Sequence, residues 1–145
     1  MKPANYIRIA AVLTFVHAVL HTVGGVFGSI SPGPEAVAAA AMKSNQFVAM
    51  GYSRTFWDFY MGMGLAVTLF LTMESVVFWL LASLAREHAS QLRPILIVFA
   101  VGYFAFAVDS YHYFFLAPVV VEVLIALCLA GAAISAPATS QSATA

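Results

Sequence analysis

The segment GLAVTLFLTMESVVFWLLASLA, residues 64–85, decides the fold of this chain. It makes about six turns of helix and carries a single charged side chain, Glu74. About 20 mostly apolar residues suffice to cross a bilayer, because the hydrocarbon core is ~30 Å thick and an α-helix rises about 1.5 Å per residue. We therefore expect a transmembrane helix over residues 55–85, with Thr55 and Asp58 at the spacing of a capping box.

The composition of the whole chain agrees with a membrane protein. Of its 145 residues, 63% are hydrophobic and 8% are charged, against roughly 25% charged in soluble domains. A water-soluble domain of this size lacks the polar surface to cover such a core. The formal net charge is zero and no basic run is present, which argues against a nucleic-acid partner. The single cysteine, Cys128, excludes an internal disulfide.

Three more helices are predicted around this segment, over residues 6–27, 94–113 and 118–134. A Ser-Pro-Gly-Pro break follows the first helix, and residues 35–50 are expected to form a short helix at the membrane interface. The polar segment REHASQLR, residues 86–93, predicts a water-exposed loop, and Pro94 suits the first turn of a helix.

The predicted fold is therefore all-α, an integral membrane four-helix transmembrane bundle over residues 1–134 with a disordered tail over residues 135–145. We expect the first helix to remain as an anchor, because its uncharged run is longer than the core of a signal peptide. The bilayer lipid is the one partner that this fold requires.

The orientation follows from the Lys and Arg residues, which are enriched on the cytoplasmic side of membrane proteins. Four of them fall on the side of the N-terminus and two on the other: Lys2, Arg8, Arg86 and Arg93 against Lys43 and Arg54. We expect a multi-pass protein of the cell inner (plasma) membrane with both termini in the cytoplasm.

Ionisable side chains inside a membrane are costly, so each is a candidate for function. Seven lie in the predicted helices: His17, His21, Asp58, Glu74, Asp109, His112 and Glu122. All except Glu74 fall in the outer half of the bilayer or at its outer surface, and they share helical stripes with small residues that allow close packing. We expect them to meet in a polar pocket that opens outward.

Two chemistries suit such a pocket. His17 and His21 lie one turn apart and, with His112, form the candidate ligand set for a divalent metal; haem is the less favoured alternative. The pocket could instead bind a small lipophilic ligand, on which Asp109 and Glu122 are the candidate catalytic acid and base. Small four-helix sterol isomerases of the emopamil-binding type use such intramembrane acids, and this chain resembles their general plan without their motifs.

At the outer interface, Arg54, Asp58 and Tyr111 are the candidate ligand-binding residues. The alternatives are that the pocket residues belong to a proton or ion relay, or only hold helices together in a non-catalytic membrane subunit. In the second case, Asp58 acts as a helix cap alone.

Glu74 stands apart, because the sixteen residues that separate it from Asp58 rotate it by roughly 160° around the helix. Its neighbours on that face are apolar, so we expect it outside the polar pocket. It would either pair across a homo-oligomer interface or reach the inner surface.

Three segments resemble small uncharacterised four-helix bacterial inner-membrane proteins. They are HTVGGVFG at residues 21–28, FWDFYMGMGL at 56–65 and DSYHYFFLAP at 109–118. The resemblance implies the same membrane topology and carries no activity.

Overall fold

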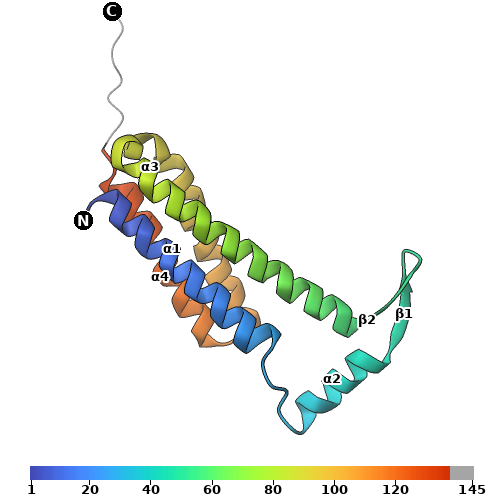
Figure 1. The fold of residues 1–145 in the computed structure, drawn as a ribbon. Coiled ribbons are helices and arrows are strands. Elements are labelled where there is room, and N and C mark those ends of the chain that lie inside the picture. The colour runs from blue at the N-terminus through green and yellow to red at the C-terminus, as the bar shows by residue number, and fades with distance from the viewer. Residues whose placement is uncertain (138–145) are drawn as a thin grey trace, which may run out of the picture. The chain divides into compact units, whose positions relative to one another are not determined.

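The computed structural model describes residues 1–137, and most of them are helical (Figure 1). The helices are α1 (Pro3–Leu20), α2 (Pro34–Ser44), α3 (Phe56–Tyr113) and α4 (Leu116–Ser135), and a π-helix, η1 (His21–Val26), continues α1. The strands are β1 (Gln46–Ala49) and β2 (Tyr52–Thr55). The predicted all-α class is confirmed, with one short hairpin added to it. Residues 138–145, which hold most of the expected disordered tail, lie outside the described part of the chain.

The chain divides into two compact units. Unit 1 contains Met1–His17 and the described residues from Thr72 onward, and unit 2 contains Ala18–Leu71. The boundary falls inside α1 and inside α3. Of the residues predicted to share one pocket, His17 belongs to unit 1 and His21 to unit 2.

Helix α3 is two helical arms joined at His88. The φ and ψ angles of this residue, −121° and 30°, are not helical. The ring centroids of Phe78 and Phe99, ten and eleven residues on either side of it, lie 4.9 Å apart. The arms are residues 56–87 and 89–113, and the parts of them that belong to unit 1, residues 72–87 and 89–113, run antiparallel (Figure 1).

The predicted loop over residues 86–93 is wrong. Helix continues on both sides of His88, and the polar side chains of the turn project from helical backbone. Pro94 lies inside the second arm, where it removes one backbone hydrogen bond. Composition identified the polar turn, but a reversal that uses a single residue leaves no glycine or proline signal at the break.

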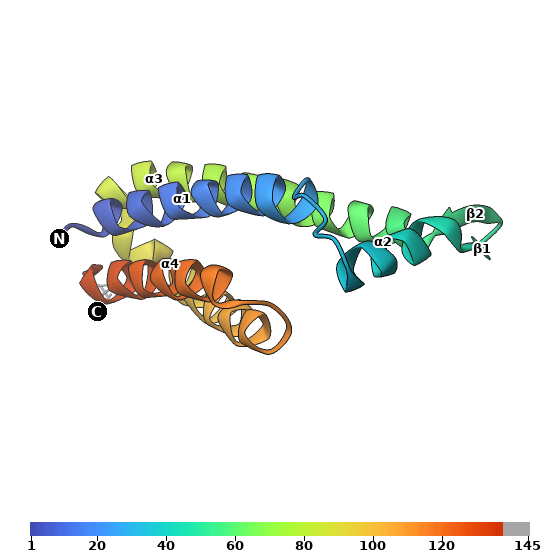
Figure 2. The same cartoon turned by 90° about the horizontal axis from the view of Figure 1, so that it is seen from below.

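The core of unit 1 lies between α1, both arms of α3 and α4. Its large, fully enclosed side chains come from all four: Ile7, Phe78, Leu96, Ile125 and Leu129. Helix α4 doubles back along the second arm of α3 (Figures 1 and 2). The N-terminus, the His88 turn and the end of α4 lie at the same end of this unit (Figure 1).

Unit 2 contains the hairpin, which the sequence analysis missed. The helix expected over residues 35–50 ends at Ser44, and β1 pairs antiparallel with β2. Met50 and Gly51 form the tip with positive φ angles, 50° and 87°, as a tight hairpin turn requires. The ring of Phe47 stacks on that of Phe59, with centroids 5.7 Å apart.

The capping box at the start of α3 is confirmed. The backbone N–H of Thr55 donates to Asp58 Oδ2 at 2.7 Å, and the backbone N–H of Asp58 donates to Thr55 Oγ1 at 3.1 Å. These two bonds satisfy donors that the first turn of a helix otherwise leaves open. The other predicted boundaries lie within a few residues of the observed ones, since α1 with η1 covers residues 3–26 and α4 covers residues 116–135.

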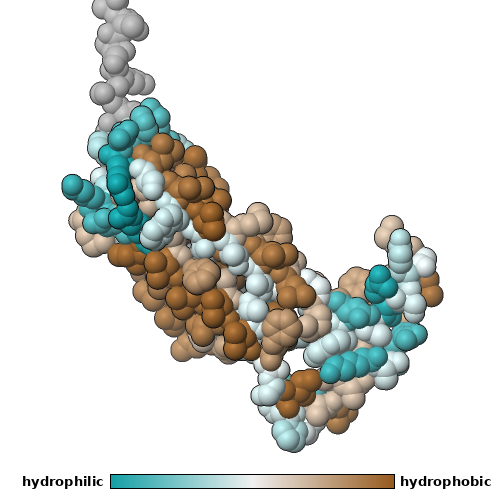
Figure 3. All heavy atoms as spheres, in the orientation of Figure 1, coloured by the Kyte–Doolittle hydropathy of each residue, from teal (hydrophilic) through white to brown (hydrophobic). Residues whose placement is uncertain are grey.

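By length and composition, three helices of the described chain could cross a membrane: Pro3–Val26, Phe56–Tyr113 and Leu116–Ser135. Large apolar side chains also cover much of their outer surface (Figure 3). Val98, for example, is 70% exposed and Leu127 is 62% exposed.

Candidate functional site

Helix α1 and the two arms of α3 meet at a polar cluster around Tyr103 in unit 1. The Tyr103 hydroxyl donates to Glu74 Oε2 at 2.6 Å, and its oxygen lies 3.4 Å from Thr14 Oγ1. Thr14 is fully buried and donates in turn to the carbonyl of Ala10 at 2.9 Å. The cluster therefore links α1 and both arms of α3 through side-chain hydrogen bonds.

The expectation that Glu74 has only apolar neighbours on its face is corrected by this contact, while its place outside the polar pocket stays a prediction. The rotation argument separated Glu74 from Asp58, which does cap the far end of its helix. However, the face on which Glu74 lies packs inward in unit 1, against the second arm. The homo-oligomer expected through this face stays a prediction. An unpaired Glu74 carboxylate was the reason for it, and in the structure this carboxylate is paired with Tyr103.

A second polar pair joins the end of α3 to α4. Ser110 Oγ donates to Glu122 Oε1 at 3.0 Å, and the two residues are only 5% and 6% exposed. Glu122 Oε2 is enclosed and has no hydrogen-bond partner among residues 1–137. Asp109 lies within electrostatic range of this carboxyl group and is itself exposed. A buried acceptor without a partner is costly, so this oxygen is a place where a proton, a water or a ligand would bind.

The polar contacts of unit 2 lie along η1. His21 Nε2 donates to the carbonyl of Gly64 at 3.1 Å, which places the proton on Nε2 because a carbonyl only accepts. Thr22 Oγ1 and Thr68 Oγ1 share a hydrogen bond at 2.9 Å. Tyr60 donates to the carbonyl of Gly25 at 3.2 Å. Within this unit, η1 is therefore held to the first arm of α3 by three bonds.

Close packing accompanies these bonds. A Cβ atom built on Gly64 would lie 2.9 Å from Cγ2 of Val26, so only glycine fits this position without a shift. Small residues that allow such an approach, with polar groups that bond across it, are typical of helix pairs in membranes.

The predicted metal ligands are not found together in the described part of the chain. Within residues 1–137, no three His, Cys, Asp or Glu side chains lie together as metal ligands would. The Nε2 atom of His21 is used by Gly64, and His112 is exposed at the end of α3. The roles proposed for the metal set His17, His21 and His112 stay predictions, as do those for Asp109 and Glu122.

The outer-interface candidates have local roles in the structure. Asp58 caps α3, and Arg54 donates to the carbonyl of Ser53 at 2.8 Å while its guanidinium lies 5.3 Å from the centre of the Tyr52 ring. Tyr111 is 73% exposed. Arg54 and Asp58 belong to unit 2, and Tyr111 belongs to unit 1.

The sequence analysis did not single out Tyr103, Thr22, Thr68 or Ser110. The signal was present, because a hydroxyl group inside an apolar span needs a partner. The sequence does not give the register between helices. This register decides whether the hydroxyl group bonds a side chain of another helix or a backbone carbonyl of its own helix.

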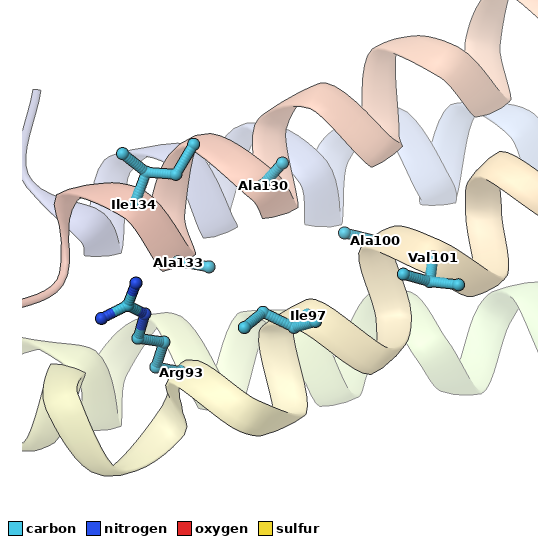
Figure 4. A pocket seen from close by; sticks show the side chains of 7 residues that line it. All are labelled: Arg93, Ile97, Ala100, Val101, Ala130, Ala133 and Ile134. Atoms are coloured by element: carbon cyan, nitrogen blue, oxygen red, sulfur yellow. The ribbon is translucent and has the colours of Figure 1, made fainter.

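Two grooves lie in unit 1, and both are mostly apolar. One has a volume of about 260 Å³ and is lined by residues of α1 and the first arm: Ala11, Val12, Phe15, Ser75, Val76 and Trp79. The other, of about 210 Å³, lies between the second arm and α4 (Figure 4). None of the predicted site residues lines either groove.

No protein-family model, curated protein or solved structure matches this chain. Its function must therefore be argued from the geometry of its own residues.

Proposed function

We propose that this chain is an integral protein of the inner membrane that crosses the bilayer four times with both termini in the cytoplasm. Each arm of α3 is long enough to cross, since 32 and 25 residues span about 48 and 37 Å at 1.5 Å per residue. Four of the six Lys and Arg residues belong to unit 1: Lys2, Arg8, Arg86 and Arg93. They support a cytoplasmic location for the end that holds the N-terminus and the His88 turn.

The exposed apolar side chains support the same proposal. Leu69, Val98 and Leu127 are each more than 60% exposed, and each lies on a different helical segment. Apolar surface in water costs roughly 25 cal/mol per Å², whereas lipid chains cover it without cost. A bilayer is the solvent that this surface fits.

Within the membrane, we propose a non-catalytic subunit whose polar side chains hold its helices together. The observation that carries this proposal is the pairing of the polar groups: Tyr103 with Glu74, Ser110 with Glu122, and His21 with Gly64. Each pair joins two helical segments within one unit. Such bonds contribute about 0.6–2 kcal/mol each in membrane helices.

Metal and haem analysis of detergent-purified protein tests this proposal. We expect no stoichiometric metal by mass spectrometry of the elements and no haem absorbance, and we expect His17→Ala to change neither. A stoichiometric metal that His17→Ala or His112→Ala removes would overturn the non-catalytic assignment. It would restore the predicted metal site.

A second candidate function is proton binding at Glu122, as part of a relay. It is favoured by the enclosed Oε2 atom, which lacks a partner among the described residues. Dicyclohexylcarbodiimide, an apolar reagent, adds to protonated carboxyl groups in apolar surroundings and leaves water-exposed carboxylates unmodified. Proton binding predicts one adduct that Glu122→Gln abolishes and Glu87→Gln, at an exposed position, does not.

If dicyclohexylcarbodiimide forms no adduct, Glu122 serves helix packing alone. That result would leave the non-catalytic subunit as the single proposal.

A further inference from the structure

The groove between the second arm of α3 and α4 combines one cation with an apolar floor. Seven residues line it: Arg93, Ile97, Ala100 and Val101 from α3, and Ala130, Ala133 and Ile134 from α4 (Figure 4). The three alanines create the hollow, because larger side chains at these positions would fill it. Its volume, about 210 Å³, is below the roughly 300–1,000 Å³ of sites for drug-sized ligands.

Arg93 is available to a ligand. The only ion pair among residues 1–137 joins Glu87 and His88 at 4.0 Å, so no carboxylate neutralises the guanidinium of Arg93. This side chain extends from its helix toward Ala133 and Ile134 rather than away from the groove (Figure 4). A guanidinium presents a planar set of donors that matches the oxygens of a phosphate group.

The order of residues along the groove matches an amphiphile. Arg93 lies five residues beyond the His88 turn, at the end of the unit that also holds the N-terminus (Figure 1). Ile97 and Val101 follow at steps of one helical turn, about 6 and 12 Å farther into the helix. An anion bound at Arg93 would therefore have an apolar track leading from it toward the middle of the bilayer.

We propose that this groove binds an anionic phospholipid, with its phosphate at Arg93 and one acyl chain between the second arm of α3 and α4. The inference rests on the proposed membrane insertion. Anionic lipids of the cytoplasmic leaflet meet basic side chains at this depth, and a single chain, rather than a compact ligand, suits the small volume of the groove.

Lipid binding by native mass spectrometry tests the site on delipidated protein in detergent. The probes are phosphatidylglycerol and phosphatidylcholine with identical acyl chains, and inorganic phosphate. We expect phosphatidylglycerol to bind more tightly, and Arg93→Gln to weaken it by about tenfold with little effect on phosphatidylcholine. Ala130→Leu, which fills the groove, should weaken both lipids.

Matched controls separate the site from general surface effects. Arg86 is an exposed cation near the same turn and does not line the groove, and Ala105 is exposed on the same arm outside it. Arg86→Gln and Ala105→Leu should each change lipid affinity by less than twofold. Equal effects of Arg86→Gln and Arg93→Gln would overturn the proposal in favour of nonspecific attraction.

Other occupants give different results. Inorganic phosphate binding as tightly as phosphatidylglycerol would make this a phosphate site and overturn the lipid assignment, as would a dimer lost in Ala130→Leu. Extraction of the protein from membranes by alkaline carbonate would refute membrane insertion itself. Retention in the membrane together with equal binding of both lipids would refute the lipid site alone.

Discussion

Tyr103 links three helical segments of unit 1 through the hydrogen bonds of its hydroxyl group. The contribution of this hydroxyl group can be tested by mutation. Tyr103→Phe keeps the ring, which packs beside Phe78 with centroids 6.0 Å apart, and removes the donor to Glu74. We expect a loss of about 1–2 kcal/mol in the free energy of unfolding, because the half-buried carboxylate loses its partner. Unfolding in detergent measures it.

Tyr113→Phe is the control for this prediction, since Tyr113 is 77% exposed. It should leave the free energy of unfolding within about 0.5 kcal/mol of the parent. Equal stability of the two variants would remove the Tyr103 hydroxyl from the list of packing contacts.

Gly64 offers a test within unit 2, with a second glycine one half-turn away. Gly64→Ala places a methyl group against Val26 and should destabilise the protein by about 1–3 kcal/mol. Gly62→Ala meets no atom within 4 Å and should be neutral or stabilise by up to about 1 kcal/mol, because alanine favours helix. Thermal unfolding of both variants, and of Gly64→Ala with Val26→Ala, decides the question.

Restored stability in the double variant is the expected result. If Gly64→Ala and Gly62→Ala behave alike, the close approach of η1 to the first arm of α3 is wrong.

Among single residues, the sequence predicted local contacts and missed distant ones. Thr55 and Asp58 lie three residues apart and bond as their spacing indicates. Glu74 and Tyr103 lie 29 residues apart, and their contact depends on where the chain reverses. The rotation angle along a helix predicts which face a residue lies on. Which segment packs against that face is decided by the tertiary structure.

The hairpin shows the same limit for a whole element. Strands of four residues carry little periodic signal, and an alanine-rich helix before them extended the predicted helix too far. The sequence sign that was available is the two-residue tip, in which Gly51 follows Met50 between the two strands.

The tip residues make the hairpin testable. Gly51→Ala forces a side chain into a conformation with φ of 87°, which costs roughly 1–2 kcal/mol. We expect amide exchange of residues 46–55 to accelerate by about tenfold. Met50→Gly, which removes a side chain from the other positive-φ position, should slow the same exchange. Unchanged exchange in both variants would refute the hairpin.

For the whole molecule, composition predicted the helical class, because long apolar runs with few charges satisfy their backbone hydrogen bonds internally when they form helices in a membrane. The candidate site fared differently. Depth and stripe placed the polar residues at similar levels, but they do not encode how the helices pack, so the partners of His21 and Glu122, Gly64 and Ser110, were not predicted.

The proposed topology is tested by cysteine labelling in a Cys128→Ser background, which removes the single native thiol. A membrane-impermeant maleimide should label Ala40→Cys in intact cells, because α2 is assigned to the outer side. It should label Ala89→Cys, next to the His88 turn, only after permeabilisation. The reverse pattern would invert the orientation.

The one-residue turn at His88 also bears on how the chain reaches its final state. The entropy lost on closing a loop grows with loop length, so two arms joined by a single residue meet at almost no cost. They can pair as soon as synthesis has delivered Tyr103, before α4 exists. Under the proposed membrane insertion, a hairpin that satisfies its own backbone groups can enter a bilayer as one body, and α4, which follows it in the chain, then docks onto a pair already formed.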